Sequence, residues 1–304
     1  MKKLYGITIA MVTPFKEDGN VDYEKVKMLT QALLAKGVNC FYPCGTTGEM
    51  VHLSAEERKK IAETVVKAAD GKAVVYIHCG ATTQEETVEL IQHAHEIGAD
   101  GVGAVTPIFL GVTAEEMESY YLTLAKSVPE DFPLYLYNIP QCAANDLSAA
   151  VAERLAEKAP NIVGIKYSFA DINRTIDYLR VKNGTFSVLH GCDRALTAML
   201  MLGCDGTVSG TAGVFPEPFV EVYQAFKKKD YVAAQEAQKA AIEIVDILKA
   251  GSNMSYFKKA LAMRGLDVGG MRAPQMDISD EETASLKEKL EKYCEKYGYN
   301  MELF

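Results

Sequence analysis

Eight short apolar segments recur along the first 210 residues of the chain, and a stretch with helical periodicity follows each of them. Several are apolar almost throughout, whereas a half-exposed strand would alternate between apolar and polar residues. Such a composition is typical of strands buried on both faces of a parallel sheet. The segments are YGITIAMVTP, VNCFYPCG, AVVYIHCG, DGVGAVTP, PLYLYN, IVGIKYS, FSVLHG and DGTVSG. Repeated strand–helix units predict an α/β fold.

Eight such units predict a (β/α)8 TIM barrel, which typically uses about 250 residues. An open, doubly wound sheet is the alternative, but that fold usually carries a Gly-rich dinucleotide turn after its first strand. The first segment here ends in VTPFKEDGN, which lacks such a turn. After residue 216 the pattern becomes purely helical. We therefore expect residues 1–216 to form the barrel and residues 217–304 to form a helical C-terminal region.

The helical stretches carry signals for their first turns. The stretch LSAEERKKIAETVVKAA repeats apolar residues at helical spacing and opens with the S-x-x-E pattern of a capping box at Ser54. The corresponding T-x-x-E pattern returns at Thr83 and Thr113 in the next two units. These signals predict that a helix begins directly after each of the three residues.

Composition excludes several classes of function and location. The net charge of −9 argues against a nucleic-acid partner, which requires a basic face. The seven cysteines are odd in number and form no C-x-x-C pair, so we expect neither a disulfide framework nor a zinc site. No segment approaches the roughly 18 apolar residues of a membrane span, and the N-terminal apolar run resembles a strand more than a signal peptide. We expect a cytoplasmic protein.

A lysine stands near the end of the sixth apolar segment. The active groups of a barrel lie at the carboxyl ends of its strands, and Lys166 follows the buried run NIVGI. One interpretation is a lysine whose ammonium group reaches water at the strand end. The other is an amine nucleophile that forms a Schiff base with a carbonyl substrate, since an apolar pocket favours the neutral amine. This residue alone does not decide between them.

Polar residues also end the second and fifth segments. Tyr137 would carry protons if it lay over the lysine of the neighbouring strand, or it would be a core residue with a solvated hydroxyl. Thr46 and Thr47 follow Gly45, either as a tight turn or as hydroxyl donors for the carboxylate of a small guest. Glu49, which completes the sequence GTTGE, is expected to hold this loop.

Two pairs of polar residues that include histidine are candidate sites. His93 and His95 lie at i and i+2 of a predicted helix, where their side chains diverge, so we interpret them as a solvated face and expect no metal site. His190 and Asp193, in LHGCDRA, close the seventh predicted strand. Asp193 is either a helix cap or, like His190, a group that contacts the polar tail of a substrate.

The sequences GTTGE, VTP, YNIP and GIK occur in this order on successive predicted strands. Over its whole length the chain resembles the dihydrodipicolinate synthase / N-acetylneuraminate lyase family. The resemblance implies a (β/α)8 barrel, usually a homotetramer built as a dimer of dimers. It also implies a Schiff base between a lysine and pyruvate or a related 2-oxo acid, with no metal or organic cofactor.

The resemblance assigns roles to particular residues. Lys166 would be the Schiff-base lysine and Tyr137 the proton shuttle, while Thr46 would relay protons and Thr47 would hold the pyruvate carboxylate. The remaining positions carried over from the family are those that place backbone groups around the pocket, Gly191 and Val208.

The chain departs from the family pattern at three places. Cys142 stands where the synthases carry an arginine for the carboxylate of aspartate semialdehyde. Ile108 and Phe109 stand where the synthases place a tyrosine that completes the relay of a neighbouring subunit. Arg194 replaces the glutamate that follows Asp193 in N-acetylneuraminate lyases.

The hypothesis is a lyase that reversibly cleaves a 2-keto-3-deoxy sugar-type acid to pyruvate and an aldehyde. Condensation of pyruvate with aspartate semialdehyde is the alternative within the family. A third hypothesis, from another class, is a barrel that binds a small acid without turning it over, which predicts no covalent adduct on Lys166.

Overall fold

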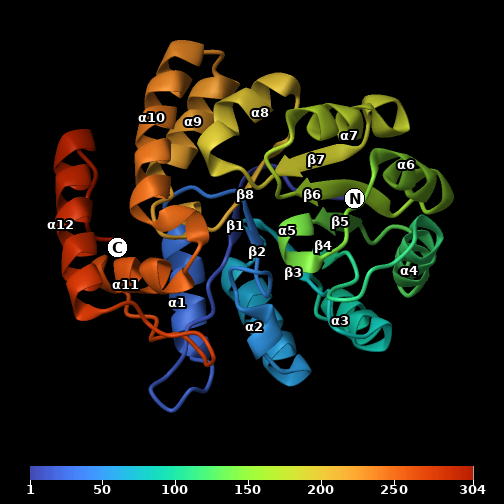
Figure 1. Ribbon diagram of the computed structural model, residues 1–304, viewed down its shortest axis with the longest axis horizontal. Coiled ribbons are helices and arrows are strands. Elements are labelled where there is room, and N and C mark those ends of the chain that lie inside the picture. Colours follow the sequence, from blue (N-terminus) through green and yellow to red (C-terminus); the bar gives the residue numbers. More distant parts are fainter. Residues whose placement is uncertain (304) are drawn as a thin grey trace.

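The computed structural model describes residues 1–303, and its centre is a closed barrel of eight parallel strands in sequence order (Figure 1). β1 pairs with both β2 and β8, which closes the barrel. The strands are β1 Gly6–Ala10, β2 Cys40–Tyr42, β3 Val74–His78, β4 Gly101–Val105, β5 Leu134–Asn138, β6 Ile162–Tyr167, β7 Ser187–His190 and β8 Gly206–Ser209. Each lies inside one of the eight apolar segments, so the predicted (β/α)8 barrel is confirmed.

Helices alternate with the strands and form a layer around the barrel. They are α1 Tyr23–Ala35, α2 Ala55–Ala69, α3 Gln84–Glu96, α4 Ala114–Lys126, α5 Pro140–Ala143, α6 Ala149–Lys158, α7 Ile172–Gly184, α8 Leu196–Leu202, α9 Glu217–Lys227, α10 Tyr231–Ile247, α11 Met254–Met263 and α12 Asp280–Tyr297. Short 3-10 helices are η1 Met50–His52, η2 Asp193–Ala195, η3 Thr211–Gly213 and η4 Lys249–Gly251.

The predicted helix starts at Ser54, Thr83 and Thr113 are confirmed. Ser54 and Thr113 form complete capping boxes, in which the side chain of each accepts from the N3 backbone and the N3 glutamate returns the bond. Thr83 accepts from the backbone N–H of Glu86. These bonds satisfy N–H groups that a helix leaves without an internal partner.

Buried side chains fill the interior of the barrel along its strands. Tyr76 and Tyr135 meet edge to face, with ring centroids 5.2 Å apart, and the Tyr135 hydroxyl donates to Ser187 Oγ at 2.7 Å. The inward residues that form this buried cluster are Leu4, Ala10, Cys40, Tyr42, Tyr76, Tyr135, Val163, Leu189 and Val208. A filled interior is typical of this fold, and it confines any cavity to the end of the barrel where the strands finish.

The strand residues that alternate with the inward-facing cluster point outward and pack against the helices. Tyr167 follows Lys166 directly, is 2% exposed, and packs edge to face on Tyr178 of α7 and on His190 of β7. It therefore points away from Lys166, as strand alternation predicts. Tyr167 is a core residue between β6 and α7.

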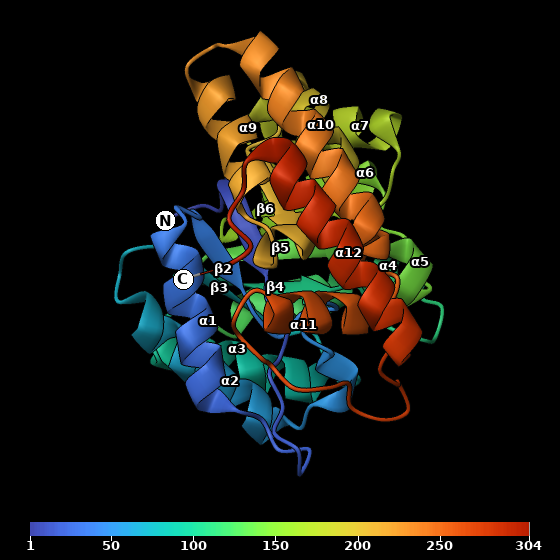
Figure 2. The ribbon, with the colours of Figure 1, turned by 90° about the vertical axis from the view of Figure 1, so that its left-hand side faces the viewer.

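The last three helices, α10 to α12, lie together at one side of the molecule (Figures 1 and 2). α9 packs against α8 and β1. An ion pair of 2.6 Å joins the half-buried Glu217 of α9 to the buried Arg264 at the end of α11. The division of the chain at residue 216 stays a prediction about domain organisation. Within residues 1–303, no helix is both long enough and apolar enough to span a membrane.

Candidate active site

The amine of Lys166 lies at the carboxyl end of the barrel, over the faces of two tyrosine rings. The side chain enters from β6 and is 4% exposed. Its Nζ atom is 3.9 Å from the ring centroid of Tyr137 and 4.9 Å from that of Tyr42. Within the described part of the chain, no carboxylate lies close enough to form an ion pair with it. The Lys166 side chain thus contacts two aromatic rings and is not engaged by a counter-ion from the described residues.

Tyr137 and Thr46 form a pair of hydroxyls beside this amine. Tyr137 of β5 lies directly opposite Lys166 in the parallel register of β5 and β6, as the neighbouring strands predicted. Its hydroxyl oxygen is 3.2 Å from Thr46 Oγ1, and either oxygen can donate. Two hydroxyls in contact can pass a proton between them. This geometry brings three of the predicted residues together: amine, phenol and threonine.

A cavity of about 350 Å³ opens above the lysine. Its lining includes seven of the residues that the sequence singled out: Thr46, Thr47, Tyr137, Lys166, Gly191, Asp193 and Val208. Gly45 and His190 are not among its lining residues. Gly45 lies at the start of the threonine turn, where its carbonyl accepts from Gly48 N at 3.0 Å. The cavity has the size of a small-molecule site and one amine at its base.

His190 points away from the cavity. Its Nδ1 accepts from the backbone N–H of Cys192 at 3.0 Å, and its ring packs on Tyr167 in the outer layer. Burial lowers the pKa of His190 to about 4, which keeps the imidazole neutral near pH 7. The geometry therefore gives no support to a direct contact between His190 and a substrate.

Asp193 does reach the cavity, and hydroxyl groups surround its carboxylate. Ser209 Oγ donates to it at 2.7 Å and Thr207 Oγ1 at 3.4 Å. Burial raises the pKa of Asp193 to about 6, while the hydroxyls of Ser209, Thr211 and Thr207 and the charge of Lys166 act in the opposite direction. The carboxylate can accept a hydroxyl of a polar substrate, the second of its two predicted roles. Its Oδ atoms cap no helix, because η2 begins at Asp193 itself without a side-chain cap.

The loop that carries Thr46 and Thr47 is held in a strained conformation at both ends. Cys44 and Glu49 have φ of +60° and +58°, a region that side chains other than glycine seldom adopt. At the first end, His78 Nδ1 donates to the Cys44 carbonyl at 2.9 Å. Burial, and then the charges of Arg58 and Lys166, lower the pKa of His78 well below its usual value. His78 thus acts here as a neutral hydrogen-bond donor.

Several lining residues come from parts of the chain that the sequence did not associate with the site. They are contributed by α5, by the residue after η4 and by α11: Gln141, Ser252, Met254 and Phe257. Ser168 also lines the cavity, and it lies in the loop beyond β6, where the active groups of a barrel are expected. Met254 and Phe257 belong to the C-terminal helices, and no local pattern connects these helices with the mouth of the barrel.

A second cavity, of about 450 Å³, adjoins the first and shares Thr46, Ile139 and Cys142 with it. Ile108 also lines it, whereas Phe109 is 87% exposed. Of the described residues that line either cavity, only Lys166 carries an ammonium or guanidinium group. Cys142, which the resemblance aligns with an arginine of the synthases, lines both cavities.

The histidines of α3 form no metal site. His93 Nε2 lies 3.1 Å from Glu63, and the exposed His95 packs on Phe132. Nowhere among residues 1–303 do three or more His, Cys, Asp or Glu side chains gather in a way that could hold a metal ion.

The sequence and the fold both have clear relatives. The model of the dihydrodipicolinate synthetase family matches residues 3–293. The 4-hydroxy-tetrahydrodipicolinate synthase of Methanothrix thermoacetophila is 34% identical over 296 residues, which cover 96% of this chain and 98% of the relative. A DapA-like lyase of Pyrococcus horikoshii is 34% identical over 288 residues, which cover 93% of this chain and 98% of the relative.

Solved structures agree with this. Dihydrodipicolinate synthase from Aquifex aeolicus superposes with a TM-score of 0.90 at 33% identity, covering 95% of this chain and 98% of that one. YagE from E. coli K12, a member of the same family solved in complex with pyruvate, gives a TM-score of 0.90 at 29% identity, covering 96% and 99% of the two chains. The chain therefore belongs to the dihydrodipicolinate synthetase family and is a lyase of that family.

Proposed function

We propose that the protein is a Schiff-base lyase that reversibly cleaves a 2-keto-3-deoxy sugar-type acid to pyruvate and an aldehyde. The observation that carries this proposal is the position of the Lys166 amine, 3.9 Å from the Tyr137 ring centroid, with the Tyr137 hydroxyl 3.2 Å from Thr46. Pyruvate is present in the solved complex of the relative YagE. The likeness between the two chains supports a 2-oxo acid in the cavity of this one.

In the proposed reaction, the neutral amine of Lys166 adds to the C2 carbonyl, and loss of water forms an iminium. Tyr137 accepts the proton of the C4 hydroxyl while the C3–C4 bond breaks. The electrons of that bond move into the C2–C3 double bond of an enamine, and the aldehyde leaves. The enamine then takes a proton at C3, and water hydrolyses the resulting iminium to release pyruvate and the free lysine.

The other groups of the cavity bind the substrate in this proposal. The hydroxyl and backbone donors of the threonine turn hold the carboxylate next to C2, with Thr47 as the nearest partner and Thr46 in the proton relay. Asp193 accepts a hydroxyl from the part of the substrate beyond C4. Gly191 and Val208 line the wall between them.

Synthesis from aspartate semialdehyde is the second candidate, because several relatives are 4-hydroxy-tetrahydrodipicolinate synthases. That aldehyde carries a carboxylate, and burying a charge without a partner is costly. Among the described residues that line the cavities, Lys166 alone carries a cationic group of the Lys or Arg type, and in this reaction it is bonded to pyruvate. An assay with pyruvate and aspartate semialdehyde separates the two reactions. The homotetramer and the cytoplasmic location stay predictions, and sedimentation would measure the first.

The first test is capture of the iminium by borohydride in the presence of pyruvate. We expect a reduced pyruvyl adduct on the peptide that contains Lys166, identified by mass spectrometry. An intact, folded protein that forms no adduct in excess pyruvate would contradict the proposal and favour a barrel that only binds small acids.

Replacement of Tyr137 by phenylalanine tests the relay. We expect the exchange of the C3 hydrogens of pyruvate with solvent deuterium, followed by NMR, to slow by about 10²- to 10⁴-fold, the usual range for loss of a general acid–base group. The adduct on Lys166 should still form, because the amine remains. Tyr135→Phe is the matched control, since the Tyr135 hydroxyl is bound to Ser187 away from the cavity. If Tyr137→Phe exchanged the C3 hydrogens of pyruvate as fast as the unchanged protein, Tyr137 would not take part in proton transfer.

A further inference from the structure

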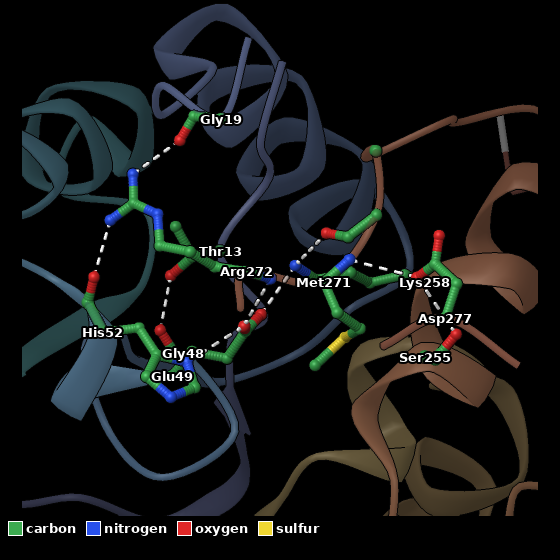
Figure 3. Close-up of polar contacts among 12 residues, drawn as sticks. Thr13, Gly19, Gly48, Glu49, His52, Ser255, Lys258, Met271, Arg272 and Asp277 are labelled. Atoms are coloured by element: carbon green, nitrogen blue, oxygen red, sulfur yellow. Dashed lines mark hydrogen bonds and ion pairs between the residues drawn. The ribbon is translucent and has the colours of Figure 1, made fainter. Parts of the chain in front are cut away.

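A fully buried ion pair joins the threonine loop to the C-terminal helices. Lys258 of α11 and Glu49 of the GTTGE sequence meet at 2.6 Å between Nζ and Oε1, and their side chains are 0% and 2% exposed (Figure 3). Lys258 Nζ also donates to the Gly270 carbonyl at 2.8 Å and lies 4.2 Å from the ring centroid of Phe15. Charges this deeply buried persist only when they are paired.

Glu49 is the second strained end of the loop that carries the threonines. Its N–H donates to the Thr46 carbonyl at 3.1 Å, and the N–H of Gly48 donates to Gly45 at 3.0 Å. The Gly48 carbonyl in turn accepts from Thr13 Oγ1 at 2.7 Å. The Glu49 N–H is thus bonded to the backbone of Thr46, while the Glu49 side chain is bound to Lys258. Glu49 has a positive φ of 58°, which persists only where the surrounding contacts support it.

Arg272 binds the residues that follow Glu49 in the chain. Its backbone N–H approaches Glu49 Oε2 at 3.4 Å, and its guanidinium donates to the His52 carbonyl at 2.6 Å (Figure 3). The same guanidinium forms two bonds with the Glu57 carboxylate, at 2.7 and 2.9 Å. Arg272 therefore holds the loop, η1 and the first turn of α2 in one arrangement.

The segment around Arg272 is itself anchored to α11. Asp277 accepts from the backbone N–H of Met271 at 3.0 Å and from Ser255 Oγ at 3.2 Å, and Ser255 Oγ accepts from Ile278 N at 2.9 Å (Figure 3). The same end of α11 supplies Met254 and Phe257 to the lining of the cavity. One helix thus covers the cavity and holds the loop beneath it.

We infer that Lys258 and Arg272 are positioning residues for the reaction, acting through Glu49 to hold Thr46 against Tyr137 and Thr47 toward the bound carboxylate. The inference rests on the proposed function. It gives the C-terminal helices a part in the chemistry without contact between Lys258 and the substrate. If the ion pair contributed only to stability, its removal would leave the active site of each folded molecule unchanged. If it positions the loop, its removal lowers the activity of the folded enzyme.

Glu49→Gln tests the inference, with Glu217→Gln as the matched control. Each substitution removes one carboxylate from an ion pair whose cation, Lys258 or Arg264, has a side chain that is 0% exposed. The Glu217 pair does not touch the threonine loop. The double variant Glu49→Gln/Lys258→Met removes both buried charges, so it folds even if the single variant does not.

Two properties of the folded protein are measured with pyruvate as the probe. They are the pyruvate concentration for half-maximal borohydride capture on Lys166 and the rate of C3 deuterium exchange at saturating pyruvate. Circular dichroism fixes a temperature at which all variants are folded. In Glu49→Gln and in the double variant we expect each property to worsen by about tenfold to hundredfold, since small displacements of positioned groups have effects of this size. Glu217→Gln should stay within about twofold of the unchanged protein, because its pair leaves the geometry of the loop intact.

Two results would overturn the inference. If the folded double variant matches Glu217→Gln in both properties, the ion pair serves stability alone while the proposed function stands. If the unchanged protein neither captures pyruvate nor exchanges its hydrogens, the proposed function fails and the inference fails with it.

Discussion

Lys166→Ala should abolish both the borohydride adduct and the exchange of pyruvate's C3 hydrogens. Without the amine no iminium can form, and no other lysine lines the cavities within the described residues. Loss of a covalent nucleophile typically lowers kcat by a factor on the order of 10⁴ to 10⁶. Mass spectrometry of the reduced protein and NMR of pyruvate in deuterium oxide measure the two effects.

The fold should survive this substitution. No ion pair is broken, because Lys166 has no carboxylate partner among the described residues, and the side chain faces a cavity. Lys67→Ala, on the exposed face of α2, is the control and should retain full capture and exchange. Exchange within about tenfold of the unchanged protein in Lys166→Ala would be incompatible with a mechanism that requires this nucleophile.

Lys258→Met should have the largest effect on stability. It leaves the Glu49 carboxylate buried without a counter-charge, and breaking one side of a buried pair costs about 3–5 kcal/mol of unfolding free energy. For a chain of this size, that loss corresponds to a fall in Tm of roughly 10 °C. Urea and thermal unfolding, at one fixed protein concentration, measure both quantities.

The neighbouring lysine provides the control for this experiment. Lys259 pairs with Asp277 at 3.2 Å, but both side chains are about one-third exposed, at 32% and 35%. Such a pair contributes about 0–1 kcal/mol, so Lys259→Met should change the stability little. Adding Glu49→Gln to Lys258→Met should recover most of the lost stability. If Lys258→Met alone unfolds like the unchanged protein, Glu49 must be neutralised by another route.

The barrel was predictable because its signals are local. Each strand lies in one apolar segment between helix start signals, and consecutive parallel strands are neighbours in a closed barrel. The same neighbourhood placed Tyr137 beside Lys166, since β5 and β6 are adjacent in sequence and in space. Tyr167 points away from Lys166 because successive side chains of a strand face opposite sides.

Residues beyond the strand ends were harder to place. His190 is the last residue of β7, and because Leu189 before it belongs to the inner cluster, strand alternation turns His190 toward the outer layer. Asp193 lies three positions later, beyond the strand, where the conformation of the turn decides that its side chain reaches the cavity. That Glu49 holds its loop stays a prediction, and the sequence did not indicate that Lys258 is the ion-pair partner of Glu49.

By itself, the sequence determined the order of strands and helices, the lysine at the end of β6 and its tyrosine neighbour, because apolar periodicity and strand adjacency act over short distances along the chain. Only the tertiary structure decided that α11 covers the cavity and that Lys258 neutralises Glu49. These contacts join segments at opposite ends of the chain. They form when helices dock on a completed barrel, and no short-range pattern in the sequence records which buried charges will meet.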